Sequence, residues 1–393
     1  MRTAILAFVI ASWGLLCPVC LPQANPSPST TERAAAPQTS NTGPSAPTVQ
    51  SLELKETIPL AYSSPRQIMS GIKCDGSGNI FVPLPDFNSD GTLRSTVLLE
   101  ILPESKSTKT FGSQPLPASE YPNQWIKYFE VDAAGTVYAL VDTHDDEKEG
   151  DKQPAPPQYF IERFNNDGST DSVVHLDYPT GTGAVGMDLH HFGVFNDGSF
   201  ILAGMQWDAA NRVEPFTAVY SSKGKFIQTV QLPDDVPGDQ ALKGEHASSA
   251  QRDAAQSAIM LGSMVSSPDG NVYLLRNSQP PRLYGVDSSG EVVKHFQLSP
   301  PSEGLDVHSV GLAGKDSLFL YFGHPPPQRP GEKPVSEWLV GIFNAVSGQF
   351  DRVYKLPSSP KRFGLPACGD ERGGLLYIGN TADNHLAVFD YGP

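Results

Sequence analysis

The chain has 393 residues, with 28 basic and 43 acidic side chains and a formal net charge of −15 at pH 7. Phosphate backbones and anionic lipid repel so acidic a surface, so we expect neither nucleic acid nor an anionic membrane as a partner. Beyond the first 24 residues the sequence has no Gly-x-Ser-x-Gly elbow, Walker loop, His-Glu-x-x-His helix or Cys-x-x-Cys metal site, so it indicates none of the enzyme classes that depend on them.

Residues 1–24 have the pattern of a secretory signal peptide. Arg2 precedes the apolar run 4–16, which is too short to span a membrane comfortably, and Ala24 offers a cleavage point. A lipoprotein anchor at Cys17 or Cys20 is the alternative, although the residues just before them are not small. We therefore expect export to the periplasm or the extracellular space, with no transmembrane segment in the mature chain.

Residues 25–48 are almost wholly Pro, Ser, Thr and Ala. Such a composition buries too little apolar area to offset the entropy of the chain, so we expect a disordered linker. The remaining residues, 49–393, are expected to form one domain, and we expect a monomer.

A β-turn-β unit recurs six times in residues 49–393. The first copy, residues 75–82, reads Asp-Gly-Ser-Gly-Asn-Ile-Phe-Val, and the fourth, residues 267–274, reads Ser-Pro-Asp-Gly-Asn-Val-Tyr-Leu. The turn glycines stand 44 to 72 residues apart, which suits a four-stranded antiparallel unit with loops of varied length. The sequence therefore predicts an all-β fold, a six-bladed β-propeller of four-stranded antiparallel blades.

The last repeat lacks a fourth strand of its own, because the chain ends soon after residues 385–391. Residues 51–60 precede the first turn and end in Leu60, as the fourth strands of the other repeats end in Leu. We expect this N-terminal strand to pair with the last blade and to close the ring, which would cover an edge prone to aggregation.

The repeated Asp-x-x-Gly-Asn-(Ile/Val)-(Phe/Tyr)-Val motif resembles that of the NHL-repeat and gluconolactonase-like six-bladed propellers, over about residues 49–392. That group includes lactonases, lyases and binding modules without catalytic activity, so the resemblance implies a fold more than a function. Its lactonases hold a divalent metal with a Glu near the first blade and with Asn and Asp from later blades. Here Glu53 and Glu56 lie on the predicted closing strand, and no matching Asn and Asp set stands out.

The pattern Gly-x-Asp-x-His occurs twice, ending at His190 and at His308, and each His stands eight residues before a turn position. Residues two apart on a strand share a face, so Asp188 with His190 and Asp306 with His308 would project into the central channel near one mouth. Two such pairs are candidates for acid–base catalysis, for holding a divalent metal, or for a polar floor beneath a ligand. The alternative is packing retained from a shared ancestral blade.

A second candidate metal site is calcium at Asp86, Asn88 and Asp90, which match the first half of a calcium-binding loop. The bidentate Glu at position 12 of such a loop is replaced by Val97, and the same residues also suit an ordinary turn.

Only two cysteines, Cys74 and Cys368, follow the signal peptide. They lie close to the turns of the first and last blades, which are neighbours in a closed ring. Export favours a disulfide between them. Two free buried thiols are the alternative.

The sequence thus predicts a ligand- or protein-binding module, whose partner is a protein, a peptide or a saccharide. The alternative is a lactonase-like hydrolase or lyase that uses the channel Asp and His residues, with or without a metal. Trp207 and the proline-rich loop 324–334 stand at strand ends, where they can form a rim for a partner.

Overall fold

The fold is built from strands. The computed structural model describes residues 48–59, 72–75, 77–87, 93–102, 107–112, 124–132, 134–143, 158–179, 183–210, 213–232, 263–276, 280–314, 316–324, 337–356, 366–369, 375–380 and 385–391. These residues form 25 strands, β1 to β25, and no helix. None of the described segments is therefore a helix long and apolar enough to cross a membrane.

Four antiparallel sheets each take four consecutive strands in chain order. The first has β3 (Lys73–Cys74), β4 (Ile80–Phe87), β5 (Leu93–Leu102) and β6 (Ser107–Phe111). The second has β7 (Gln124–Val131), β8 (Val137–Thr143), β9 (Gln158–Phe164) and β10 (Thr170–His175). The third has β11 (Ala184–Val194), β12 (Phe200–Asp208), β13 (Val213–Tyr220) and β14 (Phe226–Thr229). The fourth has β15 (Ser263–Ser266), β16 (Val272–Arg276), β17 (Arg282–Val286) and β18 (Val292–Gln297).

The fifth sheet has nine strands, in the order β1-β22-β21-β20-β19-β23-β24-β25-β2. Its members are β19 (Asp306–Leu312), β20 (Ser317–Gly323), β21 (Trp338–Asn344), β22 (Gln349–Lys355), β23 (Pro366–Gly369), β24 (Leu375–Asn380), β25 (His385–Asp390), β1 (Val49–Ser51) and β2 (Glu53–Pro59). The chain thus forms five sheets where six separate ones are expected. The difference arises because the parallel bridge between Leu312 and Cys368 joins β19 to β23.

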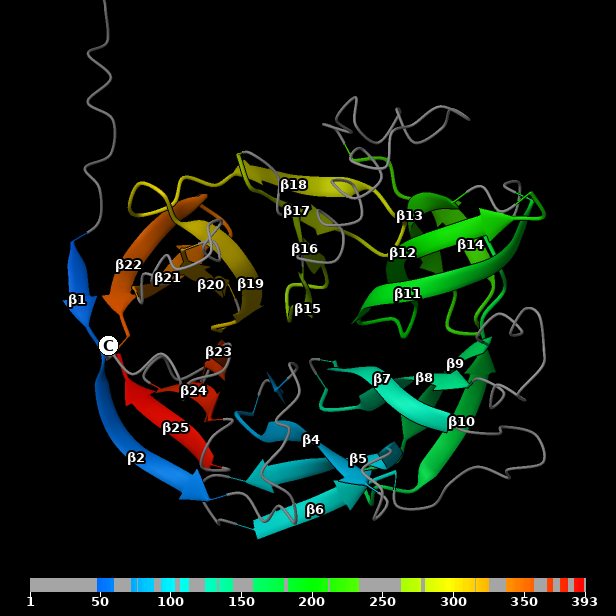
Figure 1. Ribbon diagram of the computed structural model, residues 1–393, viewed down its shortest axis with the longest axis horizontal. Coiled ribbons are helices and arrows are strands. Elements are labelled where there is room, and N and C mark those ends of the chain that lie inside the picture. Colours follow the sequence, from blue (N-terminus) through cyan, green and yellow to red (C-terminus); the bar gives the residue numbers. More distant parts are fainter. Residues whose placement is uncertain are drawn as a thin grey trace, which may run out of the picture. The chain divides into compact units, whose positions relative to one another are not determined.

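The sheets are arranged around a centre, with β7, β11, β15, β19 and β23 on the inside and β1 and β2 on the outside (Figure 1). The inner strands, with β3, which contacts β7, β19 and β23, are called the first strands below. Neighbouring first strands contact one another, as β7 contacts β11 and β15 contacts β19. The protein is therefore a β-propeller. Each four-stranded sheet is referred to below by its first strand, as in the β11 sheet, and strands β19–β22 of the fifth sheet are called the β19 sheet.

The N-terminal strand closes the ring as the sequence predicts. β2 pairs antiparallel with β25, with Glu53 opposite Asp390 and Pro59 opposite His385. Just before it, β1 pairs parallel with β22, and Leu52 between the two strands is buried. The first described residues therefore cover two sheet edges that would otherwise have unpaired backbone groups.

The repeated turns have the geometry that their sequence indicates. The N–H of Asp132 bonds to the carbonyl of Thr136, and the N–H of Phe195 bonds to that of Ser199. Gly135 and Gly198 in these turns have φ of 82° and 78°, a region that favours glycine. The recurring Gly is thus a requirement of the backbone.

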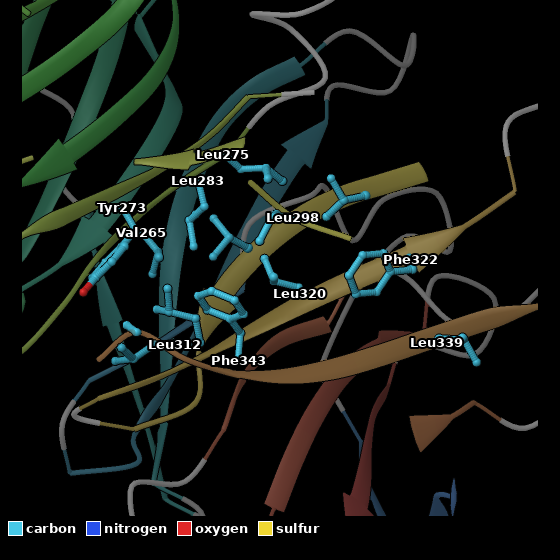
Figure 2. Close-up of a cluster of buried hydrophobic side chains, with 14 of the residues drawn as sticks. Val265, Tyr273, Leu275, Leu283, Leu298, Leu312, Leu320, Phe322, Leu339 and Phe343 are labelled. Atoms are coloured by element: carbon cyan, nitrogen blue, oxygen red, sulfur yellow. The ribbon is translucent and has the colours of Figure 1, made fainter. Parts of the chain in front are cut away.

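The core consists of apolar layers between neighbouring sheets. Figure 2 shows the layer between the β15 sheet and the β19 sheet, where Tyr273, Leu283 and Leu320 are fully buried. Strands in the middle of a sheet are buried on both faces, as in β8 and β16, while the outer β18 alternates between less and more exposed side chains. Burial of this apolar surface is the main stabilising term of the fold.

Candidate functional site on the rim

Three first strands carry a β-bulge at the same place. The pairing register shifts between Ile126 and Tyr128 in β7, between Leu189 and His191 in β11, and between Val307 and Ser309 in β19. The extra residues at these bulges are Lys127, His190 and His308. A bulge redirects the side chain of the extra residue, and bulges are frequent next to functional sites.

The three bulge residues lie at one level of the ring. Lys127 stands five residues before Asp132, and His190 five residues before Phe195, the residues that open the two turns described above. His308 likewise stands five residues before Ala313, whose N–H bonds to the carbonyl of Ser317. The term rim is used below for the end of the ring at which β7, β11 and β19 begin.

Asp188 is the centre of a polar cluster on the rim. Its Oδ1 accepts hydrogen bonds from Lys127 Nζ at 2.5 Å and from Tyr159 OH at 2.9 Å. Lys127 Nζ also donates to Tyr159 OH at 3.1 Å and lies 5.2 Å from the centre of the Tyr159 ring. The cluster thus joins β7 and β9 to β11, and the side chain of Asp188 keeps 41% of its surface exposed.

The side chains of the cluster keep the same protonation states near neutral pH. Partial burial alone would favour protonation of Asp188, but Lys127, His190 and Tyr159 stabilise its anion, and the net result is a lowered pKa. Burial and the charge of Asp188 raise the pKa of Tyr128 to about 12. Burial and the charges of Asp142 and Asp188 raise the pKa of Tyr159 as well. Asp188 is therefore ionised, and both phenols keep their protons.

His190 is paired with Asp188 by distance but not by a hydrogen bond. Its Nε2 lies 3.3 Å from Asp188 Oδ2, yet this buried atom makes no hydrogen bond, so the ring is turned away from a bonding angle. Burial lowers the pKa of His190, partly offset by Asp188, so its neutral form prevails. A ligand that approaches from solvent meets the Asp188 carboxylate rather than His190 Nε2.

The second Asp–His pair lies at the same level but in a different environment. Asp306 begins β19, opposite Gly323 of β20. The His308 ring lies 5.5 Å from Trp338 and 6.2 Å from Tyr321, and these two rings stack with centroids 5.1 Å apart. The structure thus places both pairs on the rim, at the starts of β11 and β19.

A metal does not fit the described residues. Among them, no group of three or more His, Cys, Asp and Glu side chains is arranged to hold an ion. At Asp188, the Lys127 ammonium already takes the position beside Oδ1 that a cation would need. For the expected calcium site, Asp86 lies in β4 opposite Ser95, while Asn88 and Asp90 fall outside the described residues.

Cys74, in β3, is disulfide-bonded. Cys368 belongs to β23, which contacts β3, but its side chain is outside the described part of the structure. The proline-rich loop 325–336 is also outside it, whereas Trp207, at the end of β12, lies on the rim.

Sequence reasoning missed Lys127 and Tyr159. For Lys127 a signal existed, since it stands eight residues before Gly135, as His190 stands eight residues before Gly198. No comparable spacing identifies Tyr159, which reaches Asp188 from the third strand of the preceding sheet.

Comparison with family models and with curated proteins identifies no family for this chain. No protein-family model matches the sequence, and no curated protein matches it significantly. A chain from the crystal structure of the mitotic checkpoint complex has a TM-score of 0.42 and 8% identity, covering 93% of this chain and 99% of the other. A Hadza microbial sialidase has a TM-score of 0.48 and 8% identity, covering 82% of this chain and 65% of the other. A glucose dehydrogenase has a TM-score of 0.38 and 12% identity, covering 88% of this chain and 100% of the other.

Proposed function

We propose that this propeller is an exported binding module that holds a polar ligand on the rim, at Lys127, Tyr159, Asp188 and His190. One observation carries the proposal: a partly exposed carboxylate is kept ionised and oriented by a lysine and a tyrosine from the neighbouring sheet. A few fixed polar groups of this kind orient ligands in binding sites. Because the donors are in place before the ligand arrives, little ordering entropy opposes binding.

The alternative is a hydrolase or lyase in which Asp188 and His190 act as an acid–base pair. The 3.3 Å separation favours it. The burial of His190 Nε2 opposes it, because a general base must come within hydrogen-bonding reach of the proton that it removes. The lowered pKa of Asp188 also makes this carboxyl a poor proton donor at neutral pH.

The test measures binding and turnover on the same protein. The purified protein is screened against immobilised peptides and saccharides, and it is incubated with aryl esters and lactones. We expect binding without turnover, and Asp188→Asn should weaken binding about tenfold or more, since hydrogen bonds to charged groups contribute roughly 1.5–3 kcal/mol.

Asp171→Asn is the matched control, because Asp171 is also 41% exposed and lies 3.6 Å from a cation, Arg163, but on an outer strand. Equal affinity of wild type and Asp188→Asn would refute the proposal. Turnover that disappears in His190→Ala would establish the alternative.

We also propose that the nine-stranded sheet represents two blades, β19–β22 and β23–β25 with β2, so that the propeller has six. The support is that one bridged pair, Leu312 with Cys368, joins the two halves. Cys368 is the proposed partner of Cys74, supported by the contact between β3 and β23. Such a bond suits an exported protein, because disulfides persist in oxidising compartments.

A further inference from the structure

Two tryptophans on the rim cover glycines. Trp207 of β12 lies opposite Gly186 of β11, and Trp338 of β21 lies opposite Gly323 of β20. A Cβ on either glycine would overlap the indole ring, so each ring rests against the backbone. Both tryptophans remain partly exposed. The two glycines therefore allow flat aromatic surfaces at the rim.

Each of these rings lies beside one of the two Asp–His pairs. Gly186 stands two residues before Asp188, so the Trp207 ring that covers Gly186 lies on the face of the β11 sheet to which Asp188 projects. Gly323 is directly opposite Asp306. The rim thus repeats one set of side chains, an indole, a carboxylate and an imidazole, on the β11 sheet and on the β19 sheet. The β15 sheet lies between them (Figure 1).

The charges around Asp188 favour a neutral ligand. Lys127 already balances the Asp188 carboxylate at 2.5 Å and would repel a cation. The carboxylates of Asp188 and Asp306, on a chain with a net charge of −15, disfavour an anion. A ligand with hydroxyl groups can donate to Asp188 and accept from Lys127 without carrying a charge.

The two indole rings set a second requirement for the ligand, in addition to its lack of charge. An aromatic face offers contact area to a flat apolar surface. A pyranose ring presents such a surface through its C–H groups, while its hydroxyls point outward around the ring edge. The combination of an indole face with a carboxylate and an ammonium beside it matches a sugar ring.

We propose that the rim binds a neutral oligosaccharide through two subsites, Trp207 with Asp188 and Trp338 with Asp306. This inference rests on the proposed function, which makes the rim the binding surface. Because the subsites lie on sheets that are not adjacent, the ligand has several sugar units and contacts both subsites at once. Linked contacts of this kind raise affinity by about 100-fold or more over a single one.

The experiment titrates the purified protein with neutral linear gluco-, manno- and galacto-oligosaccharides of two to eight units, and follows tryptophan fluorescence and calorimetry. We expect the longer oligosaccharides to bind about 100-fold or more tighter than the disaccharides. Trp207→Ala and Trp338→Ala should each remove this advantage, whereas Trp207→Phe should keep part of it.

Gly186→Ala and Gly323→Ala test the same surfaces without removing a ring, because the added Cβ displaces the indole. Val346→Ala, at a turn position that is 71% exposed, is the control. If none of these oligosaccharides binds, or if affinity does not depend on chain length, the two-subsite inference is wrong. Saccharide or peptide binding that needs Asp188 but neither tryptophan would also overturn it, while the proposed function would stand. Binding unaffected by Asp188→Asn would refute both.

Discussion

Two lysine–carboxylate pairs lie on the first strands, and their surroundings differ. On the rim, Lys127 and Asp188 are 2.5 Å apart, with side chains 21% and 41% exposed. Lys73 and Glu130 are 3.0 Å apart, with side chains 18% and 2% exposed. Glu130 stands three residues after Lys127 on β7, roughly 10 Å further along the strand. Similar chemistry therefore occurs once at the surface and once inside the ring.

The buried pair links three sheets. Lys73, from β3, donates to Glu130 Oε2 of β7 and, at 3.1 Å, to the carbonyl of Met264 in β15. Glu130 also accepts from the backbone N–H groups of Val131 and Ser266. With these donors satisfied inside the protein, the pair holds the first strands together. The rim pair, by contrast, leaves a carboxylate open to solvent, as the proposed binding role requires.

The largest expected effect comes from breaking the buried pair. Lys73→Met leaves the Glu130 carboxylate buried without a counter-ion, so the free energy of unfolding should fall by about 3–5 kcal/mol at pH 7. Denaturant titration of the purified protein measures it. The double variant Lys73→Met/Glu130→Gln should recover most of the loss, since no unpaired charge remains. A loss below about 1 kcal/mol in Lys73→Met would show that the pair does not hold the strands together.

The two carboxylates should respond oppositely to pH. Burial, only partly offset by Lys73, raises the pKa of Glu130 above 4.5, so the folded state holds this proton more tightly than the unfolded state does. The contribution of Glu130 to the free energy of unfolding therefore falls as the pH rises from 4.5 through the pKa of Glu130 in the folded state. The pKa of Asp188 is lowered below 3.8, so its contribution is present above 3.8 and is lost as pH falls through the folded pKa.

Unfolding free energies measured between about pH 3 and pH 7 check these signs. The stability of Glu130→Gln relative to wild type should increase with pH, and that of Asp188→Asn should decrease. A parallel pH response of the two variants would mean that their surroundings do not differ as described.

Local sequence was enough to predict the repeated strands and the closing one. The turns follow from short-range chemistry, as at Gly135 and Gly198, and residues 53–59 pair with β25 because the last repeat needs a fourth strand. The single bridge between Leu312 and Cys368 did not follow, because it depends on how closely two first strands approach at the centre. The cluster around Asp188 was only half predictable. Spacing places His190 beside it, but Lys127 and Tyr159 come from another sheet, 61 and 29 residues away.

The smallest expected change in stability is on the rim. Lys127→Met removes the same charge as Lys73→Met, but the carboxylate that it leaves is 41% exposed and can be hydrated. Exposed ion pairs contribute about 0.2–1 kcal/mol, so the free energy of unfolding should fall by less than about 1 kcal/mol. Ligand binding should nevertheless weaken, because Asp188 loses the donor that orients it. A loss as large as that of Lys73→Met, measured in the same titration, would make the rim cluster a structural ion pair and remove the basis for a binding site there.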